Sequence, residues 1–233
     1  MSYVVRMKYA LALVMVLGAC SKPDASAAPE PIVVDRDPGP GGPLPAVEPA
    51  TVGQAAVGKP APDFELESLD GAKVRLSDHK GKIVVLEWFN PECPFVKQAH
   101  TEGSLVSMAK TYAEQGVVWL AVNSNAPGKQ GSAPDANREG KSKFALEHPI
   151  LLDADGKVGR MYGADHTPHM YVIDANGTLV YAGEIDNTGS GDPEDAEPEL
   201  INYVADAIKD VKANQAVRTP ETKSWGCSVK YAR

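Results

Sequence analysis

The chain has 233 residues, of which 43% are hydrophobic and 23% charged, and its formal net charge at pH 7 is −8. This length exceeds that of one average domain. An acidic surface disfavours direct binding to nucleic acids and to anionic lipid headgroups, because both carry negative charge. The composition therefore argues against a nucleic-acid-binding protein.

The first 19 residues have the features of a secretory signal. Arg6 and Lys8 precede an apolar run over 9–17, which is too short to span a bilayer as a mature helix. Residues 17–20, Leu-Gly-Ala-Cys, resemble a bacterial lipobox, in which the signal is cut before the cysteine. The resemblance implies that Cys20 is lipidated, and the alternative is an ordinary signal peptide cut nearby.

Cleavage before Cys20 removes two positive charges and takes the formal net charge from −8 to −10. Acyl chains, rather than the acidic protein surface, would then hold the protein to the membrane. In the lipoprotein family a Ser in the next position, here Ser21, fits sorting to the outer membrane. We expect a lipid-anchored protein of the cell envelope, on its periplasmic face.

The rest of the chain divides by composition into a tether, a domain and a tail. Residues 21–50 contain eight prolines and little apolar periodicity, so we expect residues 20–56 to hold the lipidated cysteine and a disordered, semi-extended tether. The folded domain is predicted over 57–213, and a short tail over 214–233.

The expected elements of the domain alternate between strands and helices. The run Ile83–Phe89 is almost continuously apolar, as in a strand buried on both faces. Asp174-Ala175-Asn176-Gly177 is the strongest hairpin signal of the sequence. The expected elements are a hairpin of Pro62–Leu66 and Lys73–Leu76, a strand over Ile83–Phe89, a helix from Pro94 to about Gln115, a strand over Val117–Val122, a loop over Asn123–Gly140, a helix over Ser142–Glu147, a strand near Ile150–Leu152, a helix around Val158–Tyr162, a hairpin of Met170–Ile173 and Thr178–Ala182, and a helix over Glu197–Lys212. This order predicts an α/β fold with a mixed central sheet flanked by helices and an N-terminal β-hairpin.

Cys93 lies where a buried strand is predicted to turn into a helix. If Cys20 is lipidated, Cys93 and Cys227 are the two remaining thiols, and they lie in an oxidising compartment. Pro94 suits the first helical position, which makes Cys93 the expected N-cap. Free backbone N–H groups and the positive end of the helix dipole would favour the reactive thiolate. Lys97 would add positive potential, or it is a solvated helix charge.

The pattern around Cys93 resembles the thioredoxin superfamily over roughly residues 57–213, which implies a thioredoxin fold. The alignment places Cys93 on the nucleophilic first cysteine of the Cys-x-x-Cys motif. The second position is Val96, so the chain lacks the adjacent resolving thiol of that family.

Two further positions match the same superfamily. Glu87, six residues before Cys93, aligns with a buried acid beneath the active site. Burial in an apolar strand should raise the pKa of Glu87 and let it carry protons, whereas the alternative is an edge-facing or salt-bridged side chain. Thr167-Pro168 precedes a strand and matches the cis-proline loop, which implies that Thr167 and Pro168 bind the substrate.

The flanking segments resemble the redoxin branch, which includes peroxiredoxins. Asn90 and Leu86 stand where the motif Pro-x-x-x-Thr/Ser-x-x-Cys needs other residues, so peroxidase activity is not expected. A closer resemblance is to an uncharacterised peroxiredoxin-like group with two motifs. Here these are Cys-Pro-Phe-Val-Lys at 93–97 and Gly-Cys-Ser-Val-Lys-Tyr at 226–231.

The second motif places a cysteine in a tail that is too short to have its own core. We expect this tail to dock on the domain, and we hypothesise that Cys227 reaches Cys93 and resolves its mixed disulfides. A purely structural Cys93–Cys227 disulfide is the alternative, since a bridge across so long a loop could stabilise the fold by roughly 5 kcal/mol.

The sequence thus predicts an exported, lipid-anchored thiol–disulfide oxidoreductase that acts through Cys93 on protein thiols or disulfides of the envelope, without a cofactor. One alternative is a copper-binding or copper-delivery protein, with Cys93 near His100, His166 and His169. Another is a non-catalytic binding module that uses the cis-proline loop. His79 and His148 are expected to be solvated loop residues.

Overall fold

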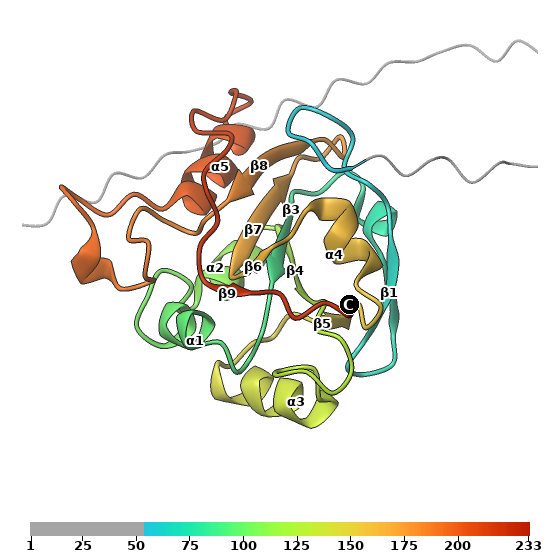
Figure 1. The fold of residues 1–233 in the computed structure, drawn as a ribbon. Coiled ribbons are helices and arrows are strands. Elements are labelled where there is room, and N and C mark those ends of the chain that lie inside the picture. The colour runs from blue at the N-terminus through green and yellow to red at the C-terminus, as the bar shows by residue number, and fades with distance from the viewer. Residues whose placement is uncertain (1–53) are drawn as a thin grey trace, which may run out of the picture. The chain divides into compact units, whose positions relative to one another are not determined.

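The computed structural model describes residues 54–233. The expected signal, Cys20 and nearly all of the expected tether lie outside the described residues. Seven strands form the main sheet in the order β2-β1-β5-β4-β3-β7-β8, and a two-stranded sheet pairs β6 with β9 (Figure 1). The strands are β1 (Glu65–Ser68), β2 (Lys73–Arg75), β3 (Val84–Trp88), β4 (Val118–Asn123), β5 (Ile150–Leu152), β6 (His166–Thr167), β7 (His169–Ile173), β8 (Leu179–Gly183) and β9 (Cys227–Ser228).

Five α-helices cover the two faces of the main sheet. They are α1 (Pro94–Thr101), α2 (Met108–Ala113), α3 (Pro134–Lys143), α4 (Lys157–Tyr162) and α5 (Tyr203–Lys212). Strand β3 is parallel to β4, and β4 to β5, whereas β7, β8, β1 and β2 continue the sheet in antiparallel pairs. The predicted mixed sheet with an N-terminal hairpin is confirmed, and the architecture is a thioredoxin fold.

Strand β3 runs through the centre of the core, and its alternate side chains enter two different apolar clusters. Leu86 and Trp88 pack on one face with Tyr171, while Val85 packs on the other face with Ile208 of α5. All five residues of β3 are buried. The expectation of a strand buried on both faces is confirmed, and it explains the continuous apolar run.

The helix predicted from Pro94 to Gln115 is wrong, because the chain breaks it into α1 and α2. Helix α1 ends at Thr101, and Ser107 before α2 has a left-handed backbone with φ +56°. At the break, a Cβ on Gly103 would lie 2.3 Å from the carbonyl oxygen of Gly191. A distant loop therefore packs closely at the break, and Gly103, directly after the C-cap Glu102, is a local helix-stop signal that the prediction overlooked.

The structure also corrects two other helices. The predicted loop over 123–140 contains the start of α3, whose first residue is Pro134, and α3 ends before the predicted Ser142–Glu147 helix does. Helix α5 starts at Tyr203 rather than Glu197, because Asn202 caps it by accepting a hydrogen bond from Ala205 N. A proline at N1 and an amide N-cap are local signals that the apolar periodicity obscured.

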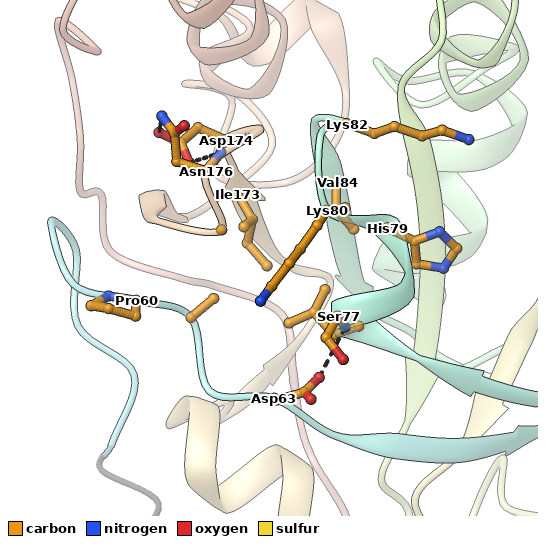
Figure 2. Close-up of a pocket in the computed structure, with 13 residues that line it drawn as sticks. Pro60, Asp63, Ser77, His79, Lys80, Lys82, Val84, Ile173, Asp174 and Asn176 are labelled. Carbon is orange, nitrogen blue, oxygen red and sulfur yellow. Dashed lines mark hydrogen bonds between the residues drawn. The ribbon is translucent and has the colours of Figure 1, made fainter. Parts of the chain in front are cut away.

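Two histidines expected to be solvated are not. His79 is half-buried beside a pocket of about 240 Å³, which lies at the end of β3 opposite Cys93 (Figure 2). The Nε2 atoms of His79 and His148 are both inaccessible to solvent and without a hydrogen-bond partner among the described residues. Within residues 54–233, no helix is long and apolar enough to cross a bilayer.

The C-terminal tail docks on the domain, as predicted. Figure 1 shows it passing from the side of α5 across β6 towards α4. Val229 is buried in the same cluster as Trp88, and the hydroxyl of Tyr231 donates to the carbonyl of Ala164. The Arg160 guanidinium lies 4.4 Å from the centre of the Tyr231 ring. The tail is therefore part of the core rather than an appendage.

Replacing Val229 with Ala should lower the free energy of unfolding by about 2 kcal/mol, because two buried methyl groups are lost and a cavity remains. Chemical denaturation of the reduced protein would measure this. The matched control is Ser228→Ala, since the neighbouring Ser228 side chain is exposed. Equal stabilities of the two variants would contradict the docked tail.

Candidate active site

Cys93 occupies the predicted position between β3 and α1. It is the N-cap residue of α1, Pro94 is the first helical residue, and the Cys93 side chain is 0% exposed. Its thiol donates a hydrogen bond to the carbonyl oxygen of Thr167, with Sγ and O 3.1 Å apart. Lys97 is exposed to solvent, which fits the interpretation as a solvated helix charge.

The acceptor of that hydrogen bond belongs to the predicted cis-proline loop. Thr167 ends β6, and the Thr167–Pro168 peptide bond is cis, as expected from the sequence. Thr167 is almost fully buried, at 1% exposure. The loop therefore presents its backbone directly to the Cys93 sulfur.

Cys227 lies beside the same two elements. Strand β9 pairs antiparallel with β6, with Thr167 opposite Cys227 and His166 opposite Ser228. Cys227 packs against the apolar cluster that contains Cys93. Burial raises the pKa of the Cys227 thiol to about 12, and the proximity of Cys93 adds to this increase. The fold thus brings the two thiols together, and both are free.

Glu87 is fully buried, as expected, but its pKa shifts in the opposite direction. Its Oε1 lies 2.7 Å from His100 Nε2, and its Oε2 accepts a hydrogen bond of 3.0 Å from Trp119 Nε1. Burial raises the pKa of Glu87, but the charge and hydrogen bond of His100 outweigh this effect and hold the pKa below its ordinary value. The prediction of a raised pKa is wrong, because the sequence did not reveal the partner.

His100 reaches Glu87 from α1, the helix that begins after Cys93. Its ring stacks on Phe144 with the centroids 5.4 Å apart, and it meets Phe89 edge-on. Phe89 and Phe144 belong to the cluster around Cys93. Among the described residues, no hydrogen bond joins Glu87 directly to Cys93. The Glu87–His100 pair is therefore a buried polar contact inside the wall of the site.

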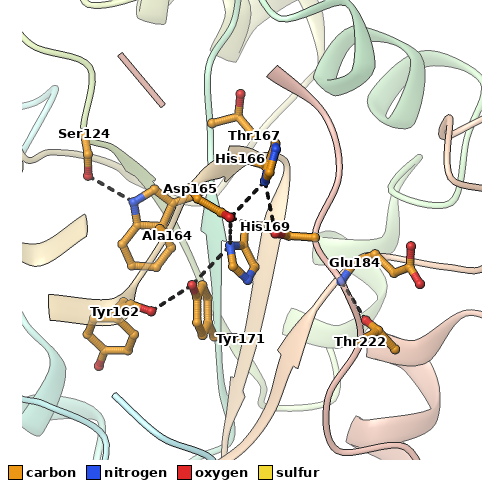
Figure 3. A network of polar contacts seen from close by, with 12 residues as sticks. Ser124, Tyr162, Ala164, Asp165, His166, Thr167, His169, Tyr171, Glu184 and Thr222 are labelled. Carbon is orange, nitrogen blue, oxygen red and sulfur yellow. Dashed lines mark hydrogen bonds and ion pairs between the residues drawn. The ribbon is translucent and has the colours of Figure 1, made fainter. Parts of the chain in front are cut away.

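A second polar network fastens the tail to the cis-proline loop (Figure 3). Asp165 Oδ1 lies 2.9 Å from His166 Nδ1 and 3.3 Å from His169 Nδ1, and it accepts a 2.7 Å hydrogen bond from Ser224 Oγ. The Tyr171 hydroxyl contacts the same nitrogen of His169 at 3.2 Å. Sequence reasoning missed Asp165 and Ser224, since no local motif marks either residue.

The histidines considered as copper ligands are engaged with carboxylates. His100 contacts Glu87, whereas His166 and His169 contact Asp165. In the part of the chain that the structure describes, no group of three or more His, Cys, Asp or Glu side chains could hold a metal ion. The predicted gathering of three histidines around Cys93 is therefore wrong.

Known proteins share this architecture. The model of the AhpC/TSA family matches residues 57–182, which is more than half of the chain. The chain belongs to this family. It is 35% identical over 146 residues to the thiol-disulfide oxidoreductase ResA of Geobacillus kaustophilus, an alignment that covers 62% of this chain and 76% of the relative. The expected class of enzyme, a thiol–disulfide oxidoreductase of thioredoxin fold, is confirmed at this level.

Two solved structures resemble the described domain. An uncharacterised conserved protein of Geobacillus kaustophilus is 30% identical with a TM-score of 0.67, and the match covers 76% of this chain and 93% of that one. A hypothetical protein of Sinorhizobium meliloti is 25% identical with the same TM-score, over 77% of this chain and 96% of that one. In both cases the similarity extends over nearly all of the solved chain.

His148 should make the stability of the protein depend on pH. Burial lowers its pKa from 6.5 to about 4. The unfolded imidazole therefore takes up a proton in a range where the folded one does not, so stability falls as the pH drops from 6.5 towards 4, by up to about 3 kcal/mol. His148→Gln should flatten this slope in urea unfolding measured across that range. Lys143→Gln, an exposed control, should keep the slope, and an unchanged slope in His148→Gln would refute the assignment.

Proposed function

We propose that the protein is an exported, lipid-anchored thiol–disulfide oxidoreductase in which Cys93 attacks and Cys227 resolves. The observation that carries this proposal is the position of Cys227, which pairs opposite Thr167, the acceptor of the Cys93 thiol, and packs against the apolar cluster that contains Cys93. A resolving thiol must reach the sulfur of the attacking cysteine, and Val96 at the usual position cannot serve. The tail supplies that thiol from the other end of the domain.

The exchange proceeds in two balanced steps. The Cys93 thiolate attacks a substrate disulfide, so that a mixed disulfide forms and one substrate sulfur leaves as a thiolate, which takes up a proton. The Cys227 thiolate then attacks the Cys93 sulfur, which forms the Cys93–Cys227 disulfide and releases the second substrate thiolate. The substrate gains two electrons and the protein loses two, and the reverse sequence oxidises a dithiol.

Both thiols must lose their protons before they attack. The Cys93 proton points at the Thr167 carbonyl, and the raised pKa of Cys227 keeps that thiol protonated at neutral pH. Glu87, which the sequence marks as a proton carrier, is bonded to His100 and Trp119. We propose that Glu87 accepts these protons through His100, which lies on α1, the helix that begins after Cys93.

The substrates we propose are protein thiols and disulfides of the cell envelope, and Thr167 and Pro168 are the residues expected to contact them. The lipobox-like residues 17–20 and the proline-rich tether support an anchor at Cys20 and a reach away from the membrane. The expected location is the periplasmic face of the envelope, at the outer membrane.

Replacing Cys93 and replacing Cys227 should impair different steps of the exchange reaction. With a small-molecule disulfide as substrate, Cys93→Ser should lose at least a hundredfold in turnover, because no attacking thiolate remains. Cys227→Ser should still form the mixed disulfide in a single turnover but not release it. Non-reducing gel analysis and mass spectrometry of alkylated peptides would detect the trapped adduct.

Val96→Ala is the control for that experiment, since it alters the neighbourhood of Cys93 without removing a thiol. It should still form the Cys93–Cys227 disulfide under oxidation. Absence of a Cys93–Cys227 peptide in oxidised wild-type protein would rule out Cys227 as the resolving thiol. A Cys227→Ser variant that turns over at the wild-type rate would do the same.

The anchor depends on a single side chain. Cys20→Ser should move the protein from the membrane fraction to the soluble fraction of the envelope and abolish incorporation of a labelled fatty acid, because the thioether to the lipid cannot form. Ser21→Ala should leave the label in place. Unchanged fractionation of Cys20→Ser would show that the ordinary signal peptide is the correct alternative.

A further inference from the structure

The tail segment, defined here as residues 225–228, lies at the place where a polypeptide substrate would have to approach Cys93. Its two-residue strand β9 pairs with the edge of β6 that carries Thr167, the acceptor of the Cys93 thiol. The Cys93 side chain is 0% exposed in this arrangement. No external polypeptide can reach the sulfur while the segment is in place.

The main-chain contacts of the tail segment are those that an added β-strand makes. Besides the β6–β9 pair, the Thr167 hydroxyl donates weakly to the Cys227 carbonyl, with the two oxygens 3.4 Å apart. Because the tail segment makes these contacts through its backbone, an extended segment of another protein can make the same contacts. The cysteine of the segment, Cys227, is the residue that faces Thr167.

Gly226 fits this position for a steric reason. Its backbone has φ +121°, and a Cβ at this position would lie 2.3 Å from the carbonyl oxygen of Thr167. The same carbonyl accepts the hydrogen bond of the Cys93 thiol. A side chain directly before the cysteine would therefore collide with the group that holds the Cys93 proton.

Trp225 provides the side-chain contact of the segment. Its ring meets Phe95 of α1 edge-on, with the centroids 5.4 Å apart. A Cβ on Gly191 would lie 3.2 Å from the Trp225 ring, so the loop carrying Gly191 also borders this ring. An aromatic residue two positions before the cysteine thus has a defined place beside α1.

We propose that the tail segment is a displaceable internal ligand: it must leave the β6 edge before Cys93 reacts with another polypeptide, and the segment that replaces it carries glycine directly before its cysteine. This proposal relies on the proposed function for the reaction itself. It adds the kind of sequence that the partner carries around its cysteine. The partner is an extended, cysteine-containing segment with glycine before the cysteine and, preferably, an aromatic residue before the glycine.

The first test measures access to Cys93 in the full chain. A maleimide attached to polyethylene glycol would label the protein in a Cys227→Ser background, and mass spectrometry would follow the Cys93 peptide alone. Adding Gly226→Ala should speed labelling of Cys93 at least tenfold, because the new Cβ forces the segment away from Thr167. The matched control is Gly116→Ala, which also has a positive φ, +83°, but whose added Cβ would have no atom within 4 Å. Equal labelling rates in the two variants would overturn the proposal.

If Gly226→Ala does not fold, as judged by near-ultraviolet circular dichroism, Trp225→Ala replaces it. That variant removes the contact with Phe95 without a collision, and it should also speed labelling of Cys93. A labelling rate equal to that of the Gly116→Ala control would overturn the proposal as well.

The second test measures binding without any redox step. A fluorescent peptide of residues 223–228 carrying Cys227→Ser should bind the protein that carries Gly226→Ala and Cys227→Ser, whose own segment is displaced, and fluorescence anisotropy would report it. The same peptide with Gly226→Ala added should bind at least tenfold more weakly. Equal binding of both peptides, or binding of neither, would refute the proposal. If the protein binds the glycine peptide more tightly than the alanine peptide but shows no thiol–disulfide exchange, the proposed function is refuted and this inference still stands.

Discussion

The structure of the site depends on one carbonyl group, that of Thr167. It accepts the Cys93 thiol, and Gly226 lies so close that a Cβ at this position would be 2.3 Å from the carbonyl oxygen. The pairing of β6 with β9 fixes both contacts, and this pairing also places Cys227 opposite Thr167. A small displacement of the β6 edge would therefore alter the attacking thiol, its partner thiol and the access route together.

The tail has two tasks that place different demands on it. Val229 and Tyr231 anchor its end in the core and against α4, so the end of the tail is part of the folded domain. The segment around Cys227 instead rests on a two-residue ladder and on the contact of Trp225 with Phe95. This arrangement allows the cysteine to move while its end stays attached, as a resolving residue needs.

The polar side chains around the site form two separate groups. Glu87 and His100 lie inside the wall behind Cys93, where burial alone would have kept the acid protonated. Asp165 lies at the surface side and holds both His166 and the tail hydroxyl of Ser224. The Glu87–His100 pair lies where it can influence the Cys93 thiol at the start of α1. The group around Asp165 connects the tail to the cis-proline loop.

The sequence alone determined the elements that depend on local patterns. The apolar run of β3, the cysteine–proline start of α1, the Asn-Gly hairpin of β7 and β8, and the cis bond before Pro168 are all found where the residues placed them. The first three features follow from burial, backbone preference and turn chemistry within a few residues, whereas the cis bond was expected from the resemblance to the thioredoxin superfamily.

Only the tertiary structure decided which distant groups meet. The packing of Gly191 against the end of α1, the lowered pKa of Glu87 beside His100, and the position of Cys227 next to the Cys93 cluster are all set by the tertiary structure. The sequence suggested that Cys227 reaches Cys93, but it did not show which strands bring the two residues together. Each of these contacts joins residues whose separation in space is set by the packing of the whole sheet, and no local pattern encodes that separation.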